Sequence, residues 1–294
     1  MRTVQSQSLT FQAEDGWQLT GDLYVGPSPK VAILVSSGTG FPRRFYRHMA
    51  VYMAEQGAVV LTYDYRGIGG SKTASIARSA IDLPDWGRLD MPAAVDVLEE
   101  KAPELPITHL AHSVGGHFLG LMPNHDKIAR NAFLAVSTGY IGHHAAHYRP
   151  MEAYFWWGLG SYSLMRHGQL KPIGGWRGEA LPPEVFKTWR RWSHRPTYFQ
   201  KDFESTLAPQ HYDQVRSPIR SWLFTDDPIA TPKAHEVLLD AYPNAPKSLA
   251  SAAPKDLNVK RIGHEGAFKP ECAALWADVF EWLANGSERR NTAP

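Results

Sequence analysis

Ser113, Asp227 and His264 each follow a segment that the sequence predicts to be a strand. The three segments are residues 107–111, 219–224 and 259–262. A serine hydroxyl is a weak nucleophile until a base takes its proton, and a histidine held by a carboxylate can be that base. Each of these residue types, taken alone, more often has a structural role in a turn. Their common position after a strand, in the order Ser, Asp, His, favours nucleophilic catalysis.

The segment 111–116, with the sequence AHSVGG, is typical of a sharp turn that carries a nucleophile. Small residues, Ala111 and Gly115, stand two positions before and after Ser113, as a strained turn between a strand and a helix requires. We expect that helix over 117–122. Its first backbone N–H groups and its dipole would favour negative charge that develops beside the serine.

Strand and helix signals alternate along much of the chain. A hairpin is expected from 9–11 and 19–24, because Asp15-Gly16 between them is a turn dipeptide. Further strands are predicted at 31–35, 58–63, 107–111, 219–224 and 259–262. Helices are predicted over 44–56, 86–99, 117–122, 232–241 and 270–283. Strands that alternate with helices indicate an α/β fold with a mostly parallel central sheet, helices on both faces and an antiparallel hairpin at the N-terminus.

The alternation stops between residues 137 and 218, where prolines and tryptophans accumulate. We interpret this region as an inserted helical cap. The predicted domains are a core of residues 1–139 and 207–294 and a cap of residues 140–206. Residues 286–294 are expected to be a frayed tail.

With these motifs in place, the sequence resembles the α/β-hydrolase superfamily over nearly its whole length, and within it the capped, peptidase-S33-like and esterase groups. The resemblance is carried by the segments 64–71 (DYRGIGGS), 111–116, 225–232 (TDDPIATP) and 263–268 (GHEGAF). It implies that Ser113 is the nucleophile, His264 the base and Asp227 the acid that orients it. Asp227 is preferred over Asp226 because related hydrolases place the acid directly before the first proline; Asp226 would then accept backbone N–H groups or cap the next helix.

The resemblance also implies an oxyanion hole made by the backbone N–H groups of Thr39 and Val114. Two positions depart from the common pattern. Ala111 replaces the first glycine of the turn, and Ser37-Gly38 stands where a His-Gly pair often opens the oxyanion loop.

Aromatic residues of the predicted cap are candidates for substrate contacts, because a cap on this fold lies above the nucleophile. The predicted substrate-binding residues are Tyr154, Trp156, Trp157, Trp176 and Trp192. Filling of the cap's own core is the alternative for each of them.

The composition limits the classes of partner. The 294 residues carry 31 Lys and Arg against 29 Asp and Glu, so the formal charge of +2 gives no electrostatic reason to expect nucleic acid or an anionic membrane. The single cysteine, Cys272, excludes an internal disulfide. No apolar run is long enough to span a bilayer, and the N-terminus lacks a secretory signal, so we expect a cytoplasmic protein. A homodimer stays open.

Other signals are weak. The segment 38–43 lacks the third glycine of a dinucleotide fingerprint, and the histidines at 143, 144 and 147 have no carboxylate partner in a zinc-site pattern. The basic and aromatic stretch 189–192 fits a cap helix better than a nucleic-acid patch. Serine at position 113 argues against the aspartate-nucleophile members of the superfamily.

The sequence therefore predicts a serine hydrolase, without cofactor or metal, that cleaves a small-molecule carboxylic ester with a small to medium apolar acyl group. Acyl transfer, thioester or amide cleavage with the same triad remain alternatives, and so does a non-catalytic ligand-binding protein on this fold.

Overall fold

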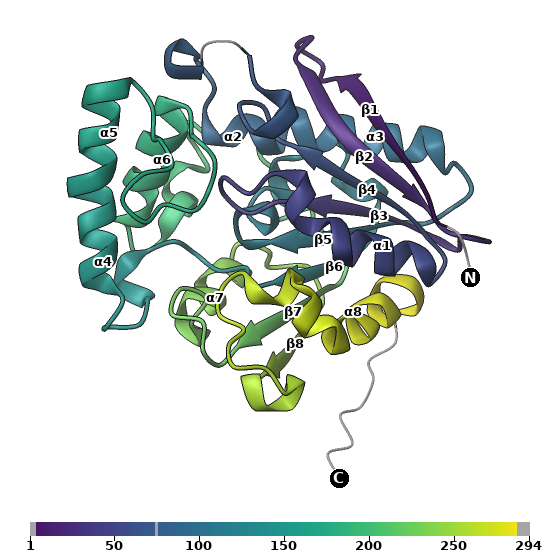
Figure 1. The fold of residues 1–294 in the computed structure, drawn as a ribbon. Coiled ribbons are helices and arrows are strands. Elements are labelled where there is room, and N and C mark those ends of the chain that lie inside the picture. Colours follow the sequence, from purple (N-terminus) through teal and green to yellow (C-terminus); the bar gives the residue numbers. More distant parts are fainter. Residues whose placement is uncertain (1–3, 74–75, 287–294) are drawn as a thin grey trace.

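The computed structural model describes residues 4–73 and 76–286. A single mixed sheet has the strand order β1-β2-β4-β3-β5-β6-β7-β8 (Figure 1). Its strands are β1 (Gln5–Gln12), β2 (Gln18–Val25), β3 (Val31–Ser36), β4 (Ala58–Asp64), β5 (Ile107–His112), β6 (Ile128–Leu134), β7 (Ile219–Phe224) and β8 (Lys247–Ala252). The hairpin β1–β2 joins β4 in antiparallel pairing, and the pairs from β4 onward are parallel. The predicted α/β-hydrolase architecture is confirmed.

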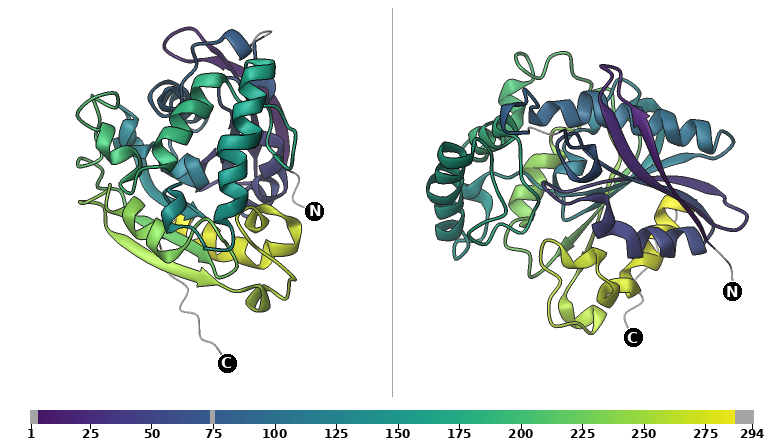
Figure 2. Two further views of the ribbon diagram at one scale, coloured as in Figure 1. Left: turned by 90° about the vertical axis from the view of Figure 1, so that its left-hand side faces the viewer. Right: turned by 45° about the horizontal axis from the view of Figure 1, so that its top comes forward.

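Every residue of β3, β4 and β5 is buried, as strands covered on both faces require. Alternate residues of β3 enter two separate cores: Ala32 and Leu34 lie in one, and Val31 and Ile33 in the other. The helices α3 (Met91–Lys101) and α7 (Pro232–Leu239) pack on the first core. The helices α1 (Arg47–Glu55) and α8 (Ala273–Asn285) pack on the second, so helices cover both faces of the sheet (Figure 2).

Two strands differ from the sequence prediction. The predicted strand 259–262 is wrong: this segment is a loop, with exposed Lys260 and Arg261, and the eighth strand is β8. The alternating exposure of β8 gives an edge strand little apolar signal. The prediction also missed β6, whose apolar run is interrupted by Arg130 and Asn131.

The helix predicted over 117–122 is also wrong. Two short 3₁₀ turns, Ser113–Gly116 and Leu119–Leu121, follow β5 instead. Backbone carbonyls that a helix would use internally are taken by phenolic groups from elsewhere: the hydroxyls of Tyr212 and Tyr242 both donate to the carbonyl of His117, at 2.7 and 2.9 Å. The Tyr212 ring fills the space beside Gly120, where a Cβ atom would lie 2.4 Å from it.

Segment 140–206 is helical and stands at one side of the sheet, apart from the helices that cover its faces (Figure 1). It contains α4 (Arg149–Ala153), a π-helical stretch (Tyr154–Leu159) and α5 (Gly160–His167), which follow one another without a break. It also contains α6 (Pro183–Ser193), and a β-bridge joins Leu170 to Leu181.

Within 4–73 and 76–286, no helix has both the length and the apolar character needed to cross a membrane. The predicted tail falls largely on residues 287–294, which lie outside the described residues.

Candidate active site

Ser113 lies in a strained turn at the end of β5. Its φ of +50° falls in the left-handed region, which few non-glycine residues adopt. A Cβ atom on Gly115 would lie 2.3 Å from the backbone oxygen of Ser36, so only glycine fits at this position. The turn therefore depends on the glycine two residues after the serine, as the sequence predicted.

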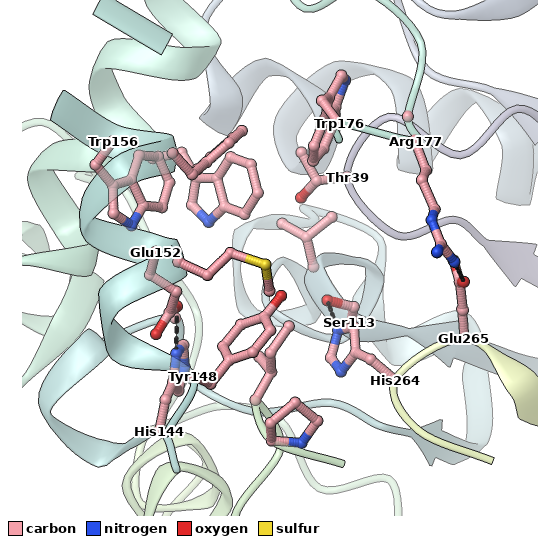
Figure 3. A pocket seen from close by; sticks show the side chains of 18 of the residues that line it. Thr39, Ser113, His144, Tyr148, Glu152, Trp156, Trp176, Arg177, His264 and Glu265 are labelled. Carbon is pink, nitrogen blue, oxygen red and sulfur yellow. Dashed lines mark hydrogen bonds and ion pairs between the residues drawn. The ribbon is translucent and has the colours of Figure 1, made fainter. Parts of the chain in front are cut away.

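His264 contacts both Ser113 and Asp227, and Figure 3 shows its ring beside the Ser113 side chain. Its Nε2 atom is 2.9 Å from Ser113 Oγ, and its Nδ1 atom is 2.7 Å from Asp227 Oδ2. An ionised carboxylate only accepts hydrogen bonds, so Nδ1 donates to Asp227. Nε2 of the neutral imidazole is then the acceptor for the Ser113 hydroxyl. The structure thus brings the three predicted residues together in the orientation that proton abstraction from the serine requires.

Charge and burial act in opposite directions on this pair. Burial lowers the pKa of His264, but the adjacent Asp227 carboxylate outweighs it, so the pKa is raised above its ordinary value. Burial raises the pKa of Asp227, but the charge of protonated His264 and the hydrogen bonds that Asp227 accepts hold it below its ordinary value.

The two adjacent aspartates have different contacts. Asp227 Oδ1 accepts the backbone N–H groups of Ile229 and Ala230, at 2.8 and 3.1 Å, which leaves Oδ2 for His264. Asp226 accepts the N–H groups of Ile262 and Gly263, at 2.9 and 3.0 Å, and so holds the loop that carries His264.

The expectation that Asp226 caps the next helix is wrong, because the Thr231 side chain caps α7. The carboxylate of Asp226 instead accepts backbone N–H groups from the loop that carries His264.

Thr39 and Val114, the predicted oxyanion donors, both line the cavity at Ser113. Val114 is the second residue of the 3₁₀ turn Ser113–Gly116, and the first N–H groups of such a turn have no partner within it. Thr39 lies in a tight turn in which Phe41 N–H donates to the Gly38 carbonyl at 3.1 Å. Above that turn, the Trp176 ring lies so close to Gly40 that a Cβ atom there would be 2.6 Å from it.

A buried hydrogen-bond chain beneath the site escaped the sequence prediction. His112 Nε2 lies 2.9 Å from the backbone oxygen of His264, and a carbonyl only accepts, so Nε2 carries the proton. His112 Nδ1 then accepts from the Tyr46 hydroxyl at 2.8 Å, and that oxygen accepts the Gly38 N–H at 2.8 Å. Burial lowers the pKa of His112 to about 3, which keeps this ring neutral.

The cavity above Ser113 has a volume of 390 Å³ and takes its walls from both the sheet end and segment 140–206. Tyr154, Trp156 and Trp176 line it, as predicted. Trp157 and Trp192 do not, so the prediction is wrong for both. Trp157 is exposed on the outer surface, and Trp192 is buried, with its indole N–H donating to Asp202 at 2.8 Å.

Sequence reasoning also missed an ionisable pair in the cavity wall (Figure 3). His144 Nδ1 lies 2.6 Å from Glu152 Oε1, and His144 Nε2 lies 3.2 Å from the backbone oxygen of Thr138. Both residues are buried and both line the cavity. Glu152 follows His144 by eight residues, and a turn separates them, so no single helix or strand pattern in the sequence links the two.

In the described part of the chain, no group of at least three His, Cys, Asp or Glu side chains is arranged to hold a metal ion. The chemistry that this arrangement supports comes from its side chains and backbone: a hydroxyl nucleophile, a base, an orienting carboxylate and N–H groups for an anion.

Comparisons with known proteins agree with this fold. Residues 27–161 match the family described as serine aminopeptidase, S33. No curated protein sequence matches the chain significantly.

Solved structures resemble the whole chain at low sequence identity. A soluble variant of the monoglyceride lipase of Saccharomyces cerevisiae is 15% identical with a TM-score of 0.66, over 98% of each chain. An esterase of Pyrococcus furiosus is 15% identical with a TM-score of 0.59, over 95% of this chain and 90% of the esterase. A carboxyl esterase of Bacillus coagulans is 16% identical with a TM-score of 0.55, over 85% and 91%. The strand order and these likenesses show that the chain has the α/β-hydrolase fold.

Proposed function

We propose that this protein is a serine hydrolase that cleaves a carboxylic ester of a small to medium apolar acyl group. The observation that carries the proposal is the hydrogen-bonded line from Ser113 Oγ through His264 to Asp227 at the floor of a cavity. A non-catalytic ligand-binding protein on this fold would not require Ser113 Oγ to lie 2.9 Å from His264 Nε2, nor the raised pKa of His264. The esterase and lipase names among the structural neighbours are consistent with the proposal.

In the proposed reaction, His264 Nε2 takes the proton of Ser113 as Oγ attacks the ester carbonyl carbon. The tetrahedral oxyanion accepts hydrogen bonds from the N–H groups of Thr39 and Val114; one such donor contributes about 3 kcal/mol of transition-state stabilisation. The C–O bond then breaks, and the imidazolium gives its proton to the leaving alcohol. Water, deprotonated by the same imidazole, attacks the acyl-enzyme and releases the acid with Ser113 restored.

The cavity supports the choice of acyl group. Its volume of 390 Å³ is at the small end of ligand pockets. Rings and aliphatic chains form much of its wall, among them Phe41, Phe155, Trp156 and Leu159. We propose that segment 140–206 acts as the cap that sets the length of this acyl site, because it supplies Phe155, Trp156 and Leu159 to the wall and lies above the serine.

A panel of p-nitrophenyl esters of rising acyl length, with matched amide and thioester substrates, tests the proposal. We expect turnover of esters with a maximum of kcat/KM at short to medium chains. Faster turnover of the amide or thioester than of the matched ester would contradict the ester assignment, and no turnover of any substrate would contradict hydrolysis.

A further inference from the structure

The outer surface of segment 140–206 carries an apolar stripe on a single helical run. Exposed large hydrophobic side chains number six in the described part of the chain, and five of them lie between Arg149 and His167. They are Met151 (54% exposed), Tyr154 (57%), Trp157 (60%), Tyr162 (53%) and Met165 (82%). Single exposed hydrophobic residues are ordinary, but five on one element mark an interaction surface. We refer to these five residues as the outer stripe.

The stripe follows the geometry of the helix. The run from Arg149 to His167 includes α4, the π-helical stretch and α5, and it faces the viewer in the left panel of Figure 2. At 1.5 Å per residue its length is about 28 Å. Its opposite side is buried, with Trp156 and Leu159 in the cavity wall. The run is therefore apolar on both sides: one side packs against the rest of the protein, and the other is exposed to solvent.

Charge on this run has one sign. Arg149 and Arg166 are exposed at its two ends. Its single acidic residue, Glu152, is buried against His144. The neighbouring helix α6 adds Arg190, whose guanidinium lies 4.8 Å from the Trp157 ring. The total charge of the chain is near zero, but this local surface is apolar in its middle and basic at its edges.

The stripe also reaches the candidate active site. Met151 and Tyr154 are more than half exposed, and both line the cavity above Ser113. A surface that touched the stripe would therefore lie beside the cavity opening. Apolar molecules leaving that surface would reach the serine with little exposure to water.

We infer that the outer stripe docks the protein onto a phospholipid surface that contains anionic lipid. Trp and Tyr with flanking arginines on an amphipathic helix are the residues that favour the boundary between headgroups and acyl chains. Anionic lipids attract the basic edges, and the sequence predicts a cytoplasmic location, where membrane leaflets carry such lipids. Hydrolysis as proposed above does not require docking, so docking is a separate property of this face.

Flotation with phosphatidylcholine vesicles, with and without phosphatidylserine, tests this inference. The test variant is the double substitution Tyr162→Ser with Met165→Ser, because neither side chain lines the cavity. The matched control is Leu249→Ser, since Leu249 is 63% exposed on β8, outside the stripe. Turnover of a soluble p-nitrophenyl ester, measured on the same samples, reports the active site independently.

We expect the wild-type protein to float with phosphatidylserine vesicles and less with pure phosphatidylcholine. The double variant should lose at least tenfold in partitioning while its turnover of the soluble ester stays unchanged, and Leu249→Ser should behave as wild type. Absence of flotation by the wild type, or equal loss in the double variant and the control, would overturn the inference. So would light scattering that shows a wild-type dimer dissociated by the double substitution with vesicle binding unaffected, because the stripe would then join two copies of the chain.

Discussion

The His112 imidazole donates from Nε2 to the backbone oxygen of His264, at 2.9 Å. The residue directly before the candidate nucleophile therefore holds the main chain of the candidate base. Through Tyr46 the same ring reaches the Gly38 N–H, beside the predicted oxyanion donor Thr39. One neutral imidazole thus links the elements that carry the nucleophile, the base and the oxyanion loop.

Substitution of His112 should reduce catalysis more than binding. His112→Leu removes the donor to the His264 carbonyl, and an unpaired buried carbonyl costs about 1–3 kcal/mol. We expect kcat to fall about tenfold or more with KM little changed, and His112→Gln, whose amide can still donate, to retain more activity. An equal loss of kcat in both variants, or a loss confined to the melting temperature, would contradict this positioning role.

Tyr46→Phe tests the other end of this hydrogen-bond chain, between His112 and Gly38. The variant removes the acceptor of the Gly38 N–H and the donor to His112, so kcat should fall while the apolar packing of the ring is kept. Tyr52→Phe is the matched control, because Tyr52 lies on α1 and packs edge-on against Trp276, with the ring centroids 5.5 Å apart, away from the site. Steady-state kinetics of both variants checks the prediction, and similar losses would argue against it.

Substitution of Asp227 should affect kcat, whereas substitution of Asp226 should affect mainly stability. Asp227→Asn should lower kcat by about 10⁴, the loss found when a triad aspartate no longer selects the imidazole tautomer. Since Asp227 raises the pKa of His264, its removal should also move the acidic limb of the rate profile to lower pH. Asp226→Asn should cost on the order of 1 kcal/mol per weakened hydrogen bond, chiefly in stability. The reverse pattern would show that Asp226 is the acid.

Buried neutral histidines should make the fold sensitive to acid. Burial lowers the pKa of His109 and His117 to about 4 and of His112 to about 3. The unfolded chain binds these protons near pH 6.5 and the folded chain does not, so the free energy of unfolding should fall as the pH drops from 6.5 towards 4.

His109 lies away from the active site, with Nδ1 3.2 Å from Asn131 Oδ1, so it can be tested without loss of the triad. His109→Gln should reduce the slope with which the free energy of unfolding falls with pH by about 1.4 kcal/mol per pH unit. Denaturant unfolding at a series of pH values measures the slope, and an unchanged slope would be inconsistent with a neutral His109.

Cavity-lining tryptophans should control acyl length. Trp176→Ala opens the wall above Gly40, so the optimum of the ester panel should move to longer chains. Trp157→Ala is the control, because that side chain is exposed and outside the cavity. An unchanged optimum for Trp176→Ala, or the same shift in both variants, would mean that the cap does not set chain length.

The elements best predicted from the sequence are those that one physical requirement dominates. β3 and β5 are buried throughout, and a continuous apolar run follows directly from that burial. The edge strand β8 is half exposed and carries no such run, so the neighbouring segment 259–262 has the stronger strand signal. The helix expected after Ser113 failed because its carbonyls bond to Tyr212 and Tyr242, distant partners that local periodicity does not reveal.

Within the site, Ser113 and Asp227 could be predicted because Ser113 directly follows β5 and Asp227 comes shortly after β7. The strand expected before His264 is a loop, so the position of His264 rested on the motif 263–268 alone. The side to which a cap tryptophan points was not. Trp156 and Trp157 are adjacent in sequence, yet one lines the cavity and the other faces outward. The partners of His112 lie 66 and 152 residues away, so no short motif contains them.

Labelling with a fluorophosphonate, read by intact mass and by peptide mapping, tests the central claim most directly. The wild type should gain one phosphonyl group on the peptide that contains Ser113, because the activated hydroxyl attacks phosphorus and displaces fluoride. Ser113→Ala should gain none and should show no ester turnover, while its melting temperature stays close to that of the wild type. Labelling that persists in folded Ser113→Ala, or a label on another residue of the wild type, would contradict the account.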